Sequence, residues 1–362
     1  MPAHRREFLK LPLAAGASAA LAPASARAAI REDNPMNLKL CRRLPAELSD
    51  DDMLYLKQIG LKWVRVRFDP KVADLDYMAR AQKRYADYGM KIHSAVFYSY
   101  REIDVQTGGP ERDRHIEDYN GFLRNCGKLG FPVASYDFHP ANTYTTAMIE
   151  SPRGYETRQF RLADFRSKVE KQKFDRTYGV EEIWEHYAYF MKATLPVAAE
   201  ADVRMALHPD DPPLGVMNGV GKMFVHYDGY ARAERIAEQI EGPGAPHWGL
   251  TFCVGTWSEG GDRMGKDVFG MIEDFGGRGK LCEIHFRAVS SPLPDFYETF
   301  PDEGYLDLYQ VMRALRQVRF TGAVMPDHVP RLAGDTGINR AGTAYCIAYM
   351  RALLERANQE VG

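Results

Sequence analysis

The chain has 362 residues, of which 45% are hydrophobic and 27% charged, and its formal net charge is −2. This composition is ordinary for a folded globular protein and excludes a disordered chain, a collagen and a coiled coil. The near-neutral charge provides no basic footprint for nucleic acid, and no apolar stretch beyond the N-terminus approaches the roughly 20 residues that a membrane-spanning helix requires. We therefore expect a soluble protein that binds neither nucleic acid nor a bilayer.

The first 28 residues have the features of an export signal. The pair Arg5 and Arg6 precedes the letters EFLK and an alanine-rich apolar region, and the triplet ARA at 26–28 provides a small-x-small cleavage site. The paired arginines resemble a bacterial twin-arginine signal. We expect residues 1–28 to be removed and the mature protein to be periplasmic, since a disordered basic tail would explain neither the apolar region nor the cleavage site.

Short apolar runs rich in β-forming residues alternate along the chain with amphipathic stretches. Several runs are apolar nearly throughout, as expected for strands that are covered on both faces. Eight such alternations predict an α/β fold, a (β/α)₈ TIM barrel, rather than an open doubly wound sheet. Residues 29–362 would then form a single catalytic domain. The predicted strands cover residues 37–44, 61–68, 90–98, 131–138, 203–209, 248–255, 281–289 and 322–329.

Helical patterns lie between the predicted strands. After the first strand, Ser49 is followed three residues later by Asp52, which is a capping-box pattern, and Gly60 is a natural stop. The stretches 183–195 and 308–318 carry apolar residues at helical spacing. We interpret these stripes as faces that pack on the core rather than as cofactor sites.

A long segment, from about Pro140 to Tyr178, follows the fourth predicted strand and is rich in Thr, Arg and Lys. It is longer than an ordinary connection between elements. Because the loops after barrel strands lie at the catalytic mouth, this insertion could form a lid. A plain surface insertion explains the sequence equally well.

Four side chains that commonly bind metals stand at the predicted C-terminal ends of strands five to eight. They are His208, within RMALHPDDPP, and then Cys253, His285 and Asp327. Barrel topology brings these ends to one mouth. Imidazole, thiolate and carboxylate together suit a divalent first-row metal such as Mn²⁺, Fe²⁺, Co²⁺ or Zn²⁺. Each residue alone has a structural explanation, such as a small buried cysteine, but their coincidence at corresponding strand ends favours a metal site.

Several of these stretches resemble landmarks of the mannonate dehydratase family. They are RMALHPDDPP, GLTFCVG, EIHFR and MPDHV, and the resemblance extends from about Leu61 to Leu354. It implies a TIM barrel that uses Mn²⁺, with the same four side chains as its ligands, and a homo-oligomer. The reaction it implies is the removal of water from D-mannonate to give 2-keto-3-deoxy-D-gluconate.

Three further residues are candidates for catalytic roles. His328, next to Asp327, can serve as a general acid or base, or support the site without touching substrate. Arg287 lies two residues after His285 and so on the same face of the strand; it either pairs with a substrate carboxylate or forms a structural ion pair. The resemblance also implies a catalytic tyrosine before the last helix, where the sequence provides only Tyr345, displaced towards the helix.

The part of the family pattern that shapes the sugar pocket is altered, since Asp137 and His139 replace residues that help to form it. We therefore expect a sugar-acid dehydratase that acts on D-mannonate or a related substrate. One alternative is a metal-dependent isomerase, epimerase or eliminating lyase for an oxidised sugar or glycoside. Another is a periplasmic carbohydrate-binding barrel that performs no catalysis.

Overall fold

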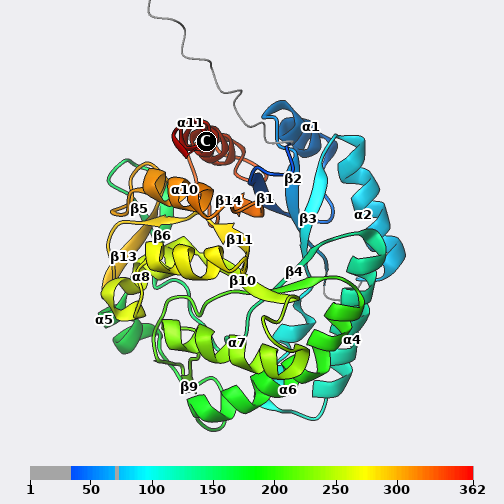
Figure 1. Cartoon of the computed structure of the whole chain (residues 1–362). Coiled ribbons are helices and arrows are strands. Elements are labelled where there is room, and N and C mark those ends of the chain that lie inside the picture. The colour runs from blue at the N-terminus through cyan, green and yellow to red at the C-terminus, as the bar shows by residue number, and fades with distance from the viewer. Residues whose placement is uncertain (1–33, 70–72, 362) are drawn as a thin grey trace, which may run out of the picture.

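A closed barrel of eight parallel strands forms the centre of the molecule (Figure 1). The structure is a computed structural model, and it describes residues 34–69 and 73–361. The strand order around the barrel is β1-β14-β11-β10-β7-β4-β3-β2. Every predicted strand is present, so the predicted (β/α)₈ barrel is confirmed. The expected export signal at residues 1–28 lies outside the described residues. The barrel strands are β1 (Lys39–Pro45), β2 (Trp63–Arg67), β3 (Lys91–Val96), β4 (Val133–Tyr136), β7 (Arg204–Leu207), β10 (Trp248–Cys253), β11 (Leu281–His285) and β14 (Ala323–Met325).

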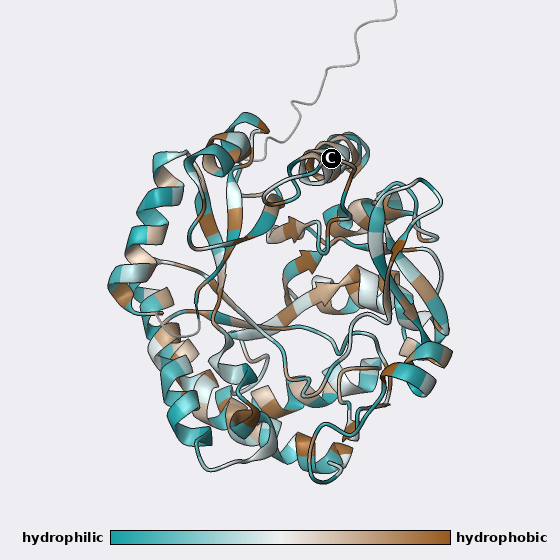
Figure 2. Cartoon of the chain, turned by 180° about the vertical axis from the view of Figure 1, so that it is seen from behind, coloured by the Kyte–Doolittle hydropathy of each residue, from teal (hydrophilic) through white to brown (hydrophobic). Residues whose placement is uncertain are grey.

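Helices surround the barrel and present hydrophilic residues along their outward sides (Figure 2). The predicted cap of the first helix is present, because the Ser49 hydroxyl accepts a hydrogen bond from the Asp52 amide at 3.1 Å. Gly60 follows the end of that helix with a φ of 73°, a conformation that favours glycine. The helices are α1 (Asp50–Gln58), α2 (Leu75–Asp87), α3 (Ile103–Thr107), α4 (Arg112–Leu129), α5 (Leu162–Asp164), α6 (Val180–Glu200), α7 (Tyr227–Glu241), α8 (Val254–Gly260), α9 (Val268–Met271), α10 (Leu308–Gln317) and α11 (Arg340–Val361).

The apolar core lies between the barrel and this ring of helices. The stripe on α6, represented by Ile183 and Leu195, is buried, and so is the stripe on α10, represented by Leu308 and Leu315. Both stripes belong to one continuous hydrophobic cluster with the barrel strands, as predicted from their helical spacing. Among the described helices, none combines the length and the hydropathy that crossing a bilayer would require.

The insertion after β4 is folded and is attached to the loop after β11. Its strands β5 (Ala147–Glu150) and β6 (Glu156–Arg161) join β12 (Ala288–Val289) and β13 (Asp295–Thr299) in a four-stranded sheet of order β12-β13-β6-β5. The pairs β5–β6, β6–β13 and β12–β13 are antiparallel. Apolar residues from both loops, including Phe160 of β6, pack together beneath this sheet. A long insertion is therefore confirmed, and its strands hold it in a defined position beside the barrel.

Candidate active site and metal centre

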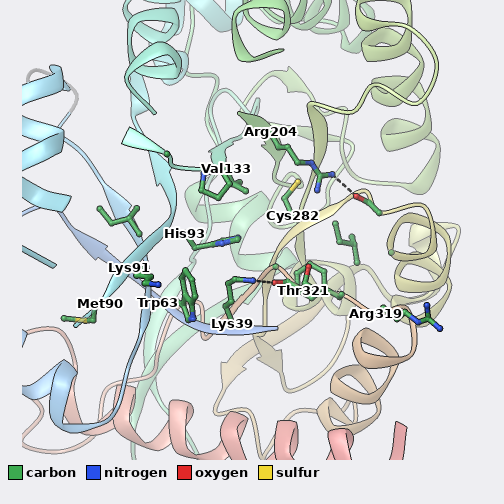
Figure 3. Close-up of a pocket in the computed structure, with 18 of the residues that line it drawn as sticks. Lys39, Trp63, Met90, Lys91, His93, Val133, Arg204, Cys282, Arg319 and Thr321 are labelled. Atoms are coloured by element: carbon green, nitrogen blue, oxygen red, sulfur yellow. Dashed lines mark hydrogen bonds between the residues drawn. The ribbon is translucent and has the colours of Figure 1, made fainter. Parts of the chain in front are cut away.

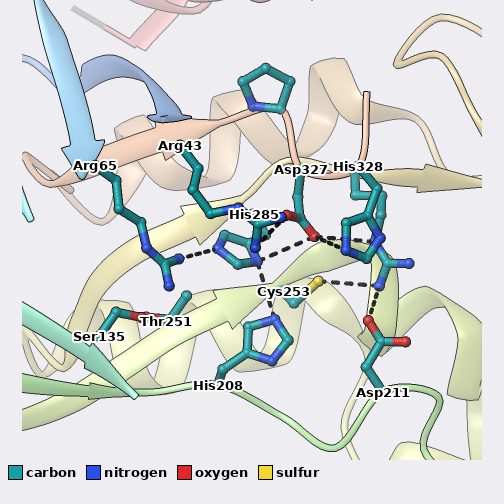
Figure 4. Close-up of polar contacts among 12 residues, drawn as sticks. Arg43, Arg65, Ser135, His208, Asp211, Thr251, Cys253, His285, Asp327 and His328 are labelled. Carbon is teal, nitrogen blue, oxygen red and sulfur yellow. Dashed lines mark hydrogen bonds and ion pairs between the residues drawn. The ribbon is translucent and has the colours of Figure 1, made fainter. Parts of the chain in front are cut away.

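The C-terminal ends of the barrel strands surround a cavity of about 220 Å³. His208 follows β7, His285 ends β11, and Asp327 and His328 follow β14; all four line the cavity. Cys253, the last residue of β10, lies beside them (Figure 4). The strand order places β7, β10, β11 and β14 next to one another, and this adjacency brings together residues that are far apart in sequence.

The four predicted metal ligands face one another. One ring nitrogen of His208, one ring nitrogen of His285 and the sulfur of Cys253 lie within 4.8 Å of one another. His285 Nδ1 is 3.1 Å from His208 Nε2 and 3.5 Å from Asp327 Oδ2. The strand register explains part of this arrangement, because Cys253 on β10 is directly opposite His285 on β11.

The electrostatics of these four side chains suit a cation. Burial lowers the pKa of His208 to about 3 and that of His285 well below its usual value, so both imidazoles are neutral. Burial also favours the neutral form of Asp327, but His328, His285 and Arg43 outweigh it and hold the pKa of Asp327 well below its usual value. Two imidazoles, a sulfur and a carboxylate therefore fit a divalent first-row metal.

Cys253 is the ligand whose state depends most on a bound cation. Burial raises the pKa of its thiol to about 12, although the nearby Arg287 acts in the opposite direction. A metal ion binds the thiolate and so promotes loss of the proton. Metal binding at this site should therefore release a proton from Cys253.

Arg287 is buried among carboxylates of the protein. Its guanidinium lies 2.7 Å from Asp211, 2.8 Å from Glu259 and 2.6 Å from Glu298. Its Nη2 also lies 3.5 Å from the sulfur of Cys253. The donors of Arg287 are thus directed at protein groups on several sides of the cluster.

His328 has a carboxylate near each ring nitrogen, Glu298 close to Nδ1 and Asp327 at 3.5 Å from Nε2. Its Nδ1 lies 2.6 Å from Oε1 of Glu298, and its Nε2 lies 3.3 Å from Nη1 of Arg158. Because the Glu298 carboxylate only accepts and the Arg158 guanidinium only donates, the proton of the neutral ring belongs on Nδ1. The φ of His328 is 45°, a conformation that non-glycine residues adopt rarely and that is concentrated at functional sites.

The structure does not bring Tyr345 to the other predicted residues. Tyr345 lies on α11 and is 36% exposed. Its hydroxyl donates a hydrogen bond to Asp302 at 2.6 Å. It is not among the residues that line the cavity.

Several residues of the site were not predicted from the sequence. Four arginines line the cavity, Arg43, Arg65, Arg101 and Arg158, and Glu298 approaches from β13. An arginine at an inward position of the alternating run WVRVR would have indicated Arg65. Nothing in the sequence distinguishes Arg158, on the insertion, from the other arginines of that segment.

Three of these arginines already pair with carboxylates, and Arg43 lies 3.7 Å from Asp327. Arg65 Nη1 lies 2.7 Å from His285 Nε2 and 3.6 Å from Glu283. Arg101 pairs with Asp137, whose carboxylate also lies 3.0 Å from His139 Nε2. Both Asp137 and His139 line the cavity, so the two residues that were expected to alter the sugar pocket lie in its wall.

The parallel barrel, with imidazole, thiol and carboxylate groups around one cavity at its mouth, defines a (β/α)₈-barrel enzyme with a donor set suited to a divalent metal. Comparison with known proteins identifies the family within this class. The sequence model of the family "D-mannonate dehydratase (UxuA)" matches residues 147–361. Mannonate dehydratase from Streptococcus pneumoniae (strain 70585) is 31% identical over 328 residues, which cover 83% of this chain and 84% of the relative. The chain belongs to the D-mannonate dehydratase family.

Comparison of folds agrees with this assignment. The crystal structure of mannonate dehydratase from Streptococcus suis serotype 2 superposes with a TM-score of 0.77 and 25% identity, and the match covers 90% of this chain and 96% of the other. The structure of L-ribulose 3-epimerase, with a TM-score of 0.56, 13% identity and coverage of 89% and 96%, shares the fold alone. The predicted family and enzyme class, a hydro-lyase acting on sugar acids, are confirmed, which favours an enzyme over a carbohydrate-binding barrel.

Proposed function

We propose that the protein removes water from D-mannonate, or from a closely related sugar acid, to give the 2-keto-3-deoxy acid. The observation that carries the proposal is the convergence of four metal-ligand side chains and an oriented histidine on one arginine-lined cavity. Because Asp137 and His139 line that cavity in place of the family's usual residues, related sugar acids belong in the same test.

The side chains of His208, Cys253, His285 and Asp327 would hold the metal, for which family membership favours Mn²⁺, with Fe²⁺, Co²⁺ and Zn²⁺ as alternatives. A bound divalent ion would stabilise the negative charge that develops on the substrate carboxylate and its neighbouring hydroxyl. Arg287 keeps Asp211, Glu259 and Glu298 in place around this centre, since it pairs with all three.

Arg158 is our candidate for binding the substrate carboxylate. It lines the cavity, and within the described residues no carboxylate forms an ion pair with it. By contrast, Arg101 pairs with Asp137 and Arg65 with Glu283. Although Arg158 Nη1 contacts His328 Nε2, the other N–H groups of its planar guanidinium can pair with a substrate carboxylate.

His328 is our candidate for the general base. Its Nδ1 proton is donated to Glu298, so Nε2 carries the lone pair, which accepts from Arg158 Nη1 at 3.3 Å. Once Arg158 turns to the substrate carboxylate, Nε2 would take the proton from C2 of the substrate. The electrons of the C2–H bond form a C2–C3 double bond as the C3–O bond breaks. The departing hydroxyl takes up a proton and leaves as water, and the resulting enol becomes the 2-keto acid. A carboxylate that orients a histidine base is an arrangement used in unrelated enzymes.

The test is to purify the chain from Ala29 onward, supply Mn²⁺, and follow the 2-keto-3-deoxy acid formed from D-mannonate. The matched control is Cys253→Ser prepared in the same way. Product from the wild type that is lost in the control would support the proposal. A wild type that binds metal stoichiometrically but releases no product from D-mannonate or from other six-carbon sugar acids would contradict it.

We also propose that residues 1–28 direct export by the twin-arginine route and that the mature enzyme is a periplasmic homo-oligomer. The export proposal is supported by Arg5, Arg6 and the ARA triplet. Replacing both arginines with lysine should retain the protein in the cytoplasm, as cell fractionation would show. Light scattering of the purified protein would test the oligomer, and a monomer would contradict that part of the proposal.

A further inference from the structure

A second cavity lies at the opposite end of the barrel (Figure 3). Its volume is about 740 Å³, in the range of sites for small molecules, roughly 300–1,000 Å³. Its lining includes the first residues of six barrel strands, Lys39 of β1, Trp63 of β2, Lys91 of β3, Val133 of β4, Arg204 of β7 and Leu281 of β11. Because the metal-ligand side chains stand at the other ends of these parallel strands, this cavity is separate from the candidate active site.

Positive side chains predominate over negative ones along the described wall of this cavity. Lys39, Lys91, Arg204 and Arg319 line it, and no aspartate or glutamate is among its lining residues. Lys39 Nζ and Arg204 Nη2 each donate to a backbone carbonyl, at 2.5 and 2.8 Å. In the part of the chain that the structure describes, none of the four forms an ion pair with a carboxylate. A concave site that is lined by charges of one sign concentrates ions of the opposite sign, which are anions in this case.

Three buried polar atoms around this cavity lack partners among the described residues. They are Nε1 of Trp63, Nε2 of His93 and Nε of Arg204. Buried polar groups are nearly always hydrogen-bonded, so such atoms call for an explanation. These three atoms are themselves covered by the protein, so a molecule in the cavity would contact other atoms of the same side chains.

The wall of the cavity also offers an apolar surface between charges. Nζ of Lys39 and Nζ of Lys91 lie 5.4 and 5.6 Å from the centre of the Trp63 ring, and the His93 ring meets the Trp63 ring edge-on. A ligand with a short carbon skeleton and one or more anionic groups would contact Trp63 while its charge faces the lysines.

We propose that this cavity is a second binding site, for a small organic anion that carries phosphate or carboxylate groups. Lys91 and Arg319 hold the charge at the rim, and Trp63, His93 and Arg204 form the inner wall. The proposal is independent of the reaction at the other end of the barrel.

The test is calorimetric titration of the full chain with inorganic phosphate and, separately, with succinate. The variant Lys91→Gln/Arg319→Gln removes two exposed charges from the rim, and Lys57→Gln/Lys192→Gln removes two exposed charges elsewhere as a matched control. Quenching of tryptophan fluorescence, compared between wild type and Trp63→Phe, reports whether the anion reaches the proposed wall.

We expect at least one of the two anions to bind to the wild type. The affinity for that anion should be at least tenfold weaker in Lys91→Gln/Arg319→Gln and should change less than twofold in Lys57→Gln/Lys192→Gln. Binding of phosphate alone would assign the site to phosphorylated ligands, and binding of succinate alone to carboxylates. The proposal is overturned if neither anion binds. It is also overturned if the rim variant binds as tightly as the wild type, because binding would then belong to the arginine-lined cavity at the mouth.

Discussion

Nδ1 of His328 lies 2.6 Å from Oε1 of Glu298, a residue 30 positions earlier in the chain. The two residues come from different loops at the barrel mouth, one after β14 and one on β13. Glu298 also accepts from Arg287, and despite its burial the neighbouring His328 and Arg287 lower the pKa of its carboxyl. An ionised carboxylate therefore fixes the orientation and the tautomer of the histidine.

We predict that Glu298→Gln lowers kcat by about 10- to 100-fold, because an amide orients the imidazole but does not stabilise its protonated form. Steady-state kinetics with D-mannonate would measure this effect, with Glu303→Gln as the control on a neighbouring loop. If His328→Ala and the double variant Glu298→Gln/His328→Ala each lose as much activity as Glu298→Gln, then Glu298 and His328 act as a unit. An unchanged kcat in Glu298→Gln would exclude Glu298 from positioning the base.

Cys253→Ser should weaken metal binding by about tenfold or more while the fold is retained, since a hydroxyl is a poorer ligand than a thiolate for first-row metals. The fold should persist because Cys253 caps α8 by accepting from the Thr256 amide at 3.4 Å, and serine is a favoured capping residue. Metal content after dialysis and the midpoint of thermal unfolding, Tm, are the measurements. Cys346→Ser is the control. Equal metal content in Cys253→Ser and wild type would remove this cysteine from the ligand set.

Arg158→Ala should raise KM for the sugar acid by about tenfold or more, because a hydrogen bond to a charged group is worth about 1.5–3 kcal/mol. Arg158→Lys should recover only part of the loss, since lysine lacks the two-pronged geometry. Arg161→Ala, on the same strand but exposed, serves as the control. A KM that does not change in Arg158→Ala would mean that another group binds the carboxylate.

Stability should fall as the pH decreases from about 4 to 2, in part through Asp137. Burial raises the pKa of Asp137, but Arg101 and then His139 outweigh it and lower the pKa from 3.8 to about 2. Because the pKa in the folded state lies below that in the unfolded chain, the ionised carboxylate stabilises the fold above about pH 4 by about 2 kcal/mol. This contribution disappears as the pH approaches 2.

Asp137→Asn removes this titration, so its Tm should fall less than that of the wild type between pH 5 and pH 2. The exposed residue Asp262, replaced in the same way, is the control. Parallel decreases in Tm for wild type and Asp137→Asn would show that other carboxyl groups dominate the acid sensitivity.

Tyr345→Phe should leave kcat and KM within about twofold of the wild type, because surface substitutions away from a site usually have small effects. The Tyr345 hydroxyl contacts Asp302 and does not line the cavity. A large loss of kcat without a change in Tm would show that Tyr345 has a catalytic role that its position on α11 does not indicate.

The fold could be predicted from the sequence because strands that are buried on both faces are apolar along their whole length, and each ends at a recognisable turn. The same regularity located His208, Cys253, His285 and Asp327, since the ends of neighbouring strands meet at one mouth. The sheet formed by β5, β6, β12 and β13 was not predicted, because runs such as ETRQFR in β6 are polar and partly exposed.

Pairings between side chains from distant loops were beyond the reach of sequence patterns. The contact of Glu298 with His328 depends on how the loop after β11 folds back over the barrel, and no periodicity within either segment encodes that distance. The two roles considered for Arg287 also could not be separated, because the positions of Asp211, Glu259 and Glu298 around its guanidinium are a property of the folded chain.

The four-stranded sheet at the mouth has a consequence for how this enzyme can change. Arg158 stands on β6 and Glu298 on β13, and these two strands are hydrogen-bonded neighbours. Arg158, proposed to bind the substrate carboxylate, and Glu298, which orients the proposed base His328, thus belong to the same four-stranded sheet. The metal-ligand side chains belong to the barrel. A shift of these two strands would alter substrate choice and proton transfer together, and it would reach the metal-ligand cluster through Arg287, which contacts both Glu298 and Cys253.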